Sequence, residues 1–108
     1  MDVIKIKSLI NHFNNLLSAS KSRIAFDEIS FSAKQGYEEQ CEAIIDRISK
    51  LNKVEVSREE LIDRFNVRLQ VLKACAVDLL TDAERVKHQN QEYLLVQFID
   101  QLKKYKEF

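Results

Sequence analysis

Proline is absent from the 108-residue sequence, and glycine occurs only once. Average usage would place about five prolines and about seven glycines in a chain of this length. Sheet-rich folds need both residues at their turns, so the deficit argues against most of them. It also argues against two domains joined by a flexible linker. We therefore expect one all-α domain over residues 1–108.

The sequence also lacks net charge, because 17 lysines and arginines balance 17 aspartates and glutamates. A neutral chain has no strong whole-molecule field for nucleic acid. No apolar run approaches the roughly 18 residues of a membrane span, and the opening MDVIKIKSLINHF has no signal-peptide pattern. Cys41 and Cys75 form no CxxC pair. These features predict a cytoplasmic protein with reduced thiols and no membrane contact.

Apolar residues recur at the spacing of amphipathic helices in four segments. We expect these helices at about residues 2–18, 26–52, 57–80 and 81–106. The second and third should form an antiparallel pair, because only residues 53–56 separate them. Four long amphipathic helices with short connections predict an antiparallel bundle.

Two capping boxes support the helix starts. Ser57 is followed three residues later by Glu60, and Thr81 by Glu84. In this spacing the hydroxyl and the carboxylate satisfy each other's backbone N–H groups. No glycine separates the third and fourth helices, so near-continuity of the two stays an open alternative.

Some positions carry expectations about packing. Gly36 interrupts the second helical pattern, which predicts either a kink or the close approach of another helix. The polar residues 83–92 are expected to face solvent or protrude. Phe26 and Phe31 are expected in the core, as are Cys41 and Cys75, which lie on apolar stripes.

No constellation for catalysis is apparent. His12 and His88 fall on different helices without neighbouring ligands, so no metal site is expected. A single glycine cannot build a phosphate-binding loop. We expect neither an enzyme nor a bound cofactor.

Basic side chains gather in two places. Lys103, Lys104 and Lys106 lie near the end of the last helix, where cations complement the helix dipole. A secondary patch on the third helix places Arg64 and Arg68 one turn apart, although Glu60 can neutralise Arg64. The complete secondary patch is Arg58, Arg64, Arg68 and Lys73.

Three stretches resemble the PriC family, primosomal replication protein N'' of bacteria. They are AFDEISF at 25–31, LIDRFNVRLQVL at 61–72 and HQNQEYLL at 88–95. Their order and spacing agree with the family over about 80 residues. The chain departs from the family pattern at Ala25 and Leu94, where arginines are usual.

The resemblance implies a non-enzymatic helical bundle that acts in replication restart. Such a protein binds the acidic C-terminal tail of single-stranded DNA-binding protein together with forked or single-stranded DNA, and it helps to reload the replicative helicase. The candidate residues for DNA or tail binding are Arg85, Lys87, His88, Glu92, Lys103, Lys104 and Lys106. The alternative is a helical protein-interaction module, such as an adaptor, a secretion chaperone or an assembly factor, with no DNA binding.

Overall fold

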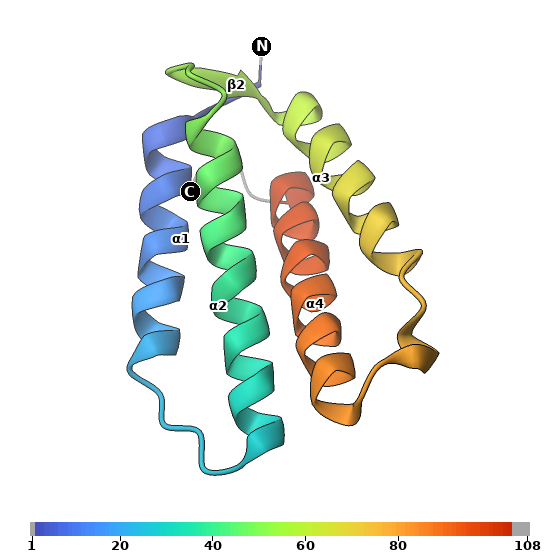
Figure 1. Cartoon of the computed structure of the whole chain (residues 1–108). Coiled ribbons are helices and arrows are strands. Elements are labelled where there is room, and N and C mark those ends of the chain that lie inside the picture. Colours follow the sequence, from blue (N-terminus) through green and yellow to red (C-terminus); the bar gives the residue numbers. More distant parts are fainter. Residues whose placement is uncertain (1, 105–108) are drawn as a thin grey trace.

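Four helices make up most of the fold (Figure 1). The computed structural model describes residues 2–104. The elements in chain order are β1 (Val3–Lys5), α1 (Ile6–Lys21), α2 (Glu28–Ser49), β2 (Glu55–Ser57), α3 (Arg58–Lys73), the 3-10 helix η1 (Val77–Leu79) and α4 (Asp82–Lys104). The expected all-α class with four long helices is confirmed.

The helices follow a different order in space than in the chain. Helix α4 lies between α2 and α3 and packs against both, while α1 packs on the other side of α2. Consecutive helices run in opposite directions, as an antiparallel bundle requires. The most extensive contact, however, joins α2 and α4, which run in the same direction. The expected direct α2–α3 pairing is therefore wrong over most of its length, because α4 separates the two helices.

A short two-stranded sheet closes one end of the bundle. The first helix begins at Ile6 and not at residue 2, because residues 3–5 form a strand antiparallel to β2. Ile4 pairs directly with Val56, and both side chains are buried. These β-branched residues favour extended backbone over the first turn of a helix.

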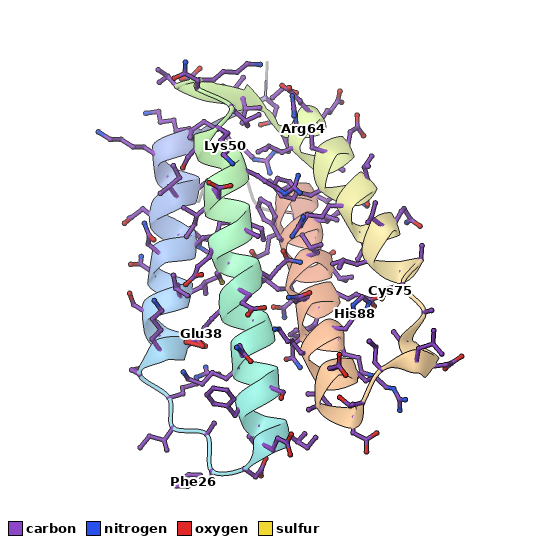
Figure 2. All side chains as sticks on the ribbon, viewed as in Figure 1. Phe26, Glu38, Lys50, Arg64, Cys75 and His88 are labelled. Atoms are coloured by element: carbon purple, nitrogen blue, oxygen red, sulfur yellow. The ribbon has the colours of Figure 1, made fainter. Side chains whose placement is uncertain are left out.

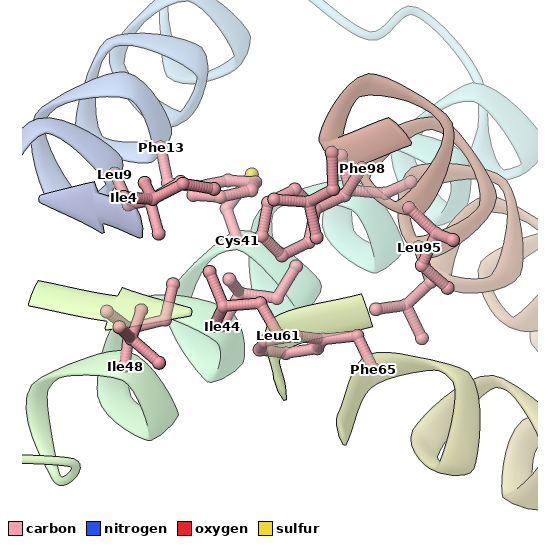
Figure 3. Packing of buried hydrophobic residues seen from close by; sticks show 14 of the residues in the cluster. Ile4, Leu9, Phe13, Cys41, Ile44, Ile48, Leu61, Phe65, Leu95 and Phe98 are labelled. Carbon is pink, nitrogen blue, oxygen red and sulfur yellow. The ribbon is translucent and has the colours of Figure 1, made fainter. Parts of the chain in front are cut away.

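The core is centred on aromatic side chains from three helices (Figure 3). The ring of Phe98 on α4 stands edge-on to Phe13 of α1 at 4.7 Å and to Phe65 of α3 at 5.0 Å. Such edge-to-face pairs add roughly 0.5–1.5 kcal/mol beyond the burial of their area. The buried apolar set is Ile4, Ile6, Leu9, Phe13, Cys41, Ile44, Ile48, Val56, Leu61, Phe65, Leu69, Leu94, Leu95, Phe98, Ile99 and Leu102.

Gly36 marks the close approach of α2 to α4. A Cβ atom at this position would lie 3.0 Å from the backbone carbon atoms of Lys87 and closer still to its carbonyl oxygen. Helix α2 is continuous from Glu28 to Ser49. Of the two alternatives predicted for Gly36, the close approach of another helix is therefore confirmed and the kink is not. The expectation that residues 83–92 protrude is wrong, because Lys87 lies within this segment and its backbone packs against α2 at Gly36. Contact between two helix backbones does not need a stripe of apolar side chains.

The third helix ends earlier than its apolar pattern indicates. It stops at Lys73, and residues 74–81, which include η1, connect it to α4, so the third and fourth helices are not continuous. Thr81 and Glu84 form the expected reciprocal capping box: the Thr81 N–H donates to Glu84 Oε1 and the Glu84 N–H donates to Thr81 Oγ1, with nitrogen-to-oxygen distances of 3.1 and 3.2 Å. An N-cap residue needs non-helical backbone, which stops a helix from running through it. Cys75 consequently lies exposed in the connection, and its expected core position is wrong.

Phe26 and Phe31 are exposed, which contradicts their expected place in the core. Phe26 is 91% exposed, and Phe31 is 54% exposed in the first turn of α2. The side chain of Asp27 accepts the backbone N–H of Ser30 at 2.7 Å and starts α2. Phe26 therefore belongs to the loop before the helix, beyond the end of α1.

Replacing Gly36 with alanine tests the close approach. Alanine favours an exposed helix by about 1 kcal/mol relative to glycine. Here we expect Gly36→Ala to lower the free energy of unfolding by about 1–3 kcal/mol, because α4 must move to admit the methyl group. Urea unfolding followed by circular dichroism measures the change. Gln35→Ala on the exposed neighbouring position is the matched control, and equal behaviour of the two variants would contradict the packing.

The two thiols should differ sharply in reactivity. Burial raises the pKa of Cys41 to about 12, aided by the charges of Glu38 and Glu42. Because the thiolate is the reactive form, the folded protein should react with an aromatic disulfide reagent at Cys75 alone. We expect one fast thiol per folded chain and two after denaturation. A Cys75→Ser variant should show none until it unfolds, and a fast native reaction of that variant would refute the assignment.

Candidate functional site

Three arginines from α2 and α3 converge over a small apolar pocket of about 60 Å³. We call this site the arginine pocket; its lining residues are Arg47, Ile48, Leu51, Arg64, Phe65 and Arg68. Arg64 and Arg68 lie one turn apart on α3, so their side chains share a face. Arg47 reaches the same site from the last turn of α2. Positive groups around an apolar floor suit a ligand that carries both carboxylates and an apolar side chain.

Gln40 positions Arg68 at the edge of the pocket. The side chain of Gln40 is 1% exposed, although it is polar. Its Oε1 accepts two hydrogen bonds from Arg68, from Nε at 3.1 Å and from Nη2 at 2.9 Å. Its Nε2 donates to the carbonyl oxygen of Gln91 at 3.2 Å. One buried amide thus joins α2, α3 and α4 and orients the guanidinium.

Arg64 is held from its own helix. Its Nε and Nη2 donate to Glu60 Oε1 at 3.2 and 3.0 Å, so the expected neutralising contact is present. The hydrogen bond from Arg64 lowers the pKa of Glu60. Ser57 caps α3 by accepting the backbone N–H of Glu60 at 3.2 Å. This box lacks its reciprocal half, since the Glu60 carboxylate is directed to Arg64 and to Lys53, at 3.7 Å.

The pocket is electrostatically prepared for an anion. Burial lowers the pKa of Arg68, and the nearby charge of Arg47 lowers it further. Both effects disfavour the bare guanidinium cation. Gln40 is a neutral acceptor and leaves the charge of Arg68 uncompensated. A carboxylate bound here would offset both effects.

The other two members of the secondary basic patch lie elsewhere. Arg58 is buried, with its Nε 2.7 Å from Asp2 Oδ2 and its Nη1 donating to the carbonyl oxygen of Leu102. It ties the start of α3 and the residue before β1 to the last turns of α4. Lys73 follows Arg64 by nine residues, which places it about half a turn away around α3. Only Arg64 and Arg68 of the predicted patch come together.

The basic residues predicted on α4 do not form one surface. Lys87 and Lys103 are 16 residues apart, which separates them by about 24 Å along the helix and about 160° around it. Lys87 is 2.9 Å from Glu39, and Lys104 is 3.0 Å from Asp100.

Arg85 also has local partners. Its guanidinium lies 3.6 Å from Asp82 and donates to the Leu80 carbonyl oxygen at 3.5 Å. Lys106 lies outside the described residues.

His88 and Glu92 join two helices. His88 is buried, and its Nε2 lies 2.8 Å from the carbonyl oxygen of Leu72 and 3.1 Å from Glu92 Oε1. Both partners are acceptors, so this nitrogen carries the proton and donates. Leu72 is in the last turn of α3, and its carbonyl oxygen also accepts the backbone N–H of Cys75, so the His88 contact fixes α3 to α4 at a helix end that is already capped. This geometry gives His88 a structural role, with little surface for a ligand.

Metal binding and membrane insertion have no matching feature among residues 2–104. No three histidine, cysteine, aspartate or glutamate side chains there gather closely enough to hold a metal ion. No helix in the same stretch combines the length and apolar character needed to cross a bilayer.

Sequence reasoning missed Arg47 and Gln40. Both residues are on α2, whereas the basic clusters that the sequence indicated are on α3 and α4. Only the relative placement of α2 and α3 makes Arg47 and Gln40 part of the site.

Comparison with protein-family models, curated proteins and solved structures finds no match to this chain. The function must therefore be argued from the site itself.

The hydrogen bonds of Gln40 can be tested by an isosteric replacement. Gln40→Met keeps the volume but leaves the Arg68 guanidinium without its acceptor. We expect a loss of about 1–3 kcal/mol in the free energy of unfolding, because buried polar groups lose their partners. Thermal or urea unfolding measures it, with Gln89→Met at an exposed position of α4 as control. A stability equal to that of the control variant would show that the network contributes nothing.

Proposed function

We propose that the protein is a PriC-like replication-restart adaptor whose arginine pocket binds the acidic C-terminal tail of single-stranded DNA-binding protein. The observation that carries the proposal is the convergence of Arg47, Arg64 and Arg68 over an apolar floor. This chemistry and the resemblance over three ordered stretches support the same ligand class.

The tail would bind by two kinds of contact. Its carboxylates would pair with the guanidinium groups, which present planar donors suited to carboxylate oxygens. An apolar side chain of the tail would contact Leu51, the half-buried apolar residue of the lining. Gln40 acts as a positioning residue, because its side-chain oxygen accepts two hydrogen bonds from Arg68 and leaves the positive charge of the guanidinium in place. Glu60 would compete with the tail for Arg64, which favours a ligand with several carboxylates.

The proposed role is that of a bridge. Bound to the tail, the protein would be localised to forked or single-stranded DNA and would help to reload the replicative helicase. It would act in the cytoplasm and would perform no catalysis. The neutral net charge makes protein contacts the main source of its affinity, with DNA contacts secondary.

A second candidate is a protein-interaction module without DNA binding, such as an adaptor, a secretion chaperone or an assembly factor. The exposed apolar side chains at the loop between α1 and α2 favour it. Exposed apolar surface, where it forms a large patch, marks protein contact sites. The two candidates differ in whether fork DNA binds.

The tail-peptide titration is the direct test. We expect a labelled acidic tail peptide to bind the protein at low salt, measured by fluorescence anisotropy. Arg47→Gln and Arg68→Gln should each weaken binding by about tenfold or more, because each removes a charge-assisted hydrogen bond. Binding should also weaken as salt rises.

Matched controls remove basic residues outside the pocket. Arg85→Gln and Lys104→Gln should bind the peptide as the unaltered protein does. Both residues lie outside the pocket, where Arg85 pairs with Asp82 and Lys104 pairs with Asp100. Absence of peptide binding at low salt would refute the proposed function. Peptide binding without binding of a forked DNA would favour the second candidate.

A further inference from the structure

The loop between α1 and α2 presents an aromatic side chain beside carboxylates. Phe26 is 91% exposed, and Ile24 in the same loop is 77% exposed. Asp27 and Glu28 follow Phe26 directly, and both are exposed. Helix α2 starts at this point, so the segment is held in place by the Asp27 cap. Residues 26–28 therefore present an apolar ring and two carboxylates in a fixed shape.

The same chemistry is complementary to the arginine pocket. The pocket combines guanidinium groups with an apolar floor, and the loop combines carboxylates with an aromatic ring. Hydrogen bonding to Ser30 lowers the pKa of Asp27, so this carboxyl stays ionised. Arg23 belongs to the same loop, but it lines a separate hollow of about 360 Å³ with Tyr37 and Tyr93, and the lining of this hollow does not include Phe26.

The loop and the pocket of one chain cannot meet. Helix α2 is continuous between them, and the 19 residues from Glu28 to Arg47 span about 28 Å. Figure 2 places Phe26 at one end of the bundle and Arg64 towards the other. Any docking of this loop into this pocket must therefore occur between two molecules.

We propose that the arginine pocket is occupied by the Phe26-Asp27-Glu28 segment of a second copy of this chain. The inference rests on the proposed function, because it assigns to the tail-binding site a competing occupant. The Phe26 ring lies over the pocket against Leu51, which is half-buried, and the two carboxylates face the arginines.

Such a contact is heterologous, because the two molecules contribute different surfaces. Each bound copy still exposes one loop and one pocket, so association continues head to tail into short open chains. Self-association and tail binding then exclude each other at the pocket. At high local concentration the protein masks its own site, and the tail must displace a neighbouring copy.

Complementary variants test the geometry. Sedimentation velocity should show association of the unaltered protein as its concentration rises towards about 1 mM, the range of weak association. Phe26→Ser removes the loop contact and Arg47→Gln weakens the pocket, so each variant alone should stay largely monomeric. An equimolar mixture of the two variants should form dimers and nothing larger. The intact loop of Arg47→Gln can bind the intact pocket of Phe26→Ser, and no second intact pair remains to extend the chain. Leu79→Ser, at an exposed apolar position of η1, should behave like the unaltered protein.

The outcomes separate this inference from the proposed function. Phe26→Ser should still bind the tail peptide, and excess peptide should dissociate the chains of the unaltered protein. A monomeric unaltered protein at about 1 mM that binds the peptide would overturn the inference and leave the proposed function standing. Association that the mixture does not reproduce, or that Phe26→Ser does not reduce, would overturn the inference as well. The Phe26→Ser variant has an unoccupied pocket where it is monomeric. If this variant does not bind the tail peptide under those conditions, the proposed function is refuted.

Discussion

The close approach of α2 and α4 at Gly36 is the constraint on which the rest of the structure depends. At a position without a side chain, two parallel helices meet backbone to backbone beside Lys87. One turn further along α2, this spacing lets the amide of Gln40 reach the carbonyl oxygen of Gln91. The same amide then holds Arg68 of α3. The arginine pocket therefore depends on a glycine that does not touch it.

The helical class and two helix starts could be predicted from the sequence, because both depend on residues that are close together in the chain. The helical class follows from periodicity, and the helix starts at Ser57 and Thr81 follow from hydroxyls that satisfy nearby backbone N–H groups. The strand at 3–5 was missed because its partner lies more than 50 residues away. Phe26 was misplaced because apolar character does not reveal whether another element covers a side chain.

The site was harder to predict than the fold for the same reason. Arg64 and Arg68 share a helix face, which spacing reveals. Arg47 and Gln40 join them only because α4 lies between α2 and α3 and sets their separation. A net charge of zero also conceals the site, because many surface charges are paired along their own helices, as in Lys50 with Asp46. Local concentration of one sign, and not the total, gives this surface its preference for anions.

The placement of α4 has a consequence for how the chain folds during its synthesis. This helix follows the other three in sequence but lies between two of them in space. A ribosome therefore releases α2 and α3 before the helix that both of them pack against. Phe65 in particular has no Phe98 to pack against until α4 emerges. The nascent chain must keep this apolar surface from aggregating, and cooperative folding follows translation of α4.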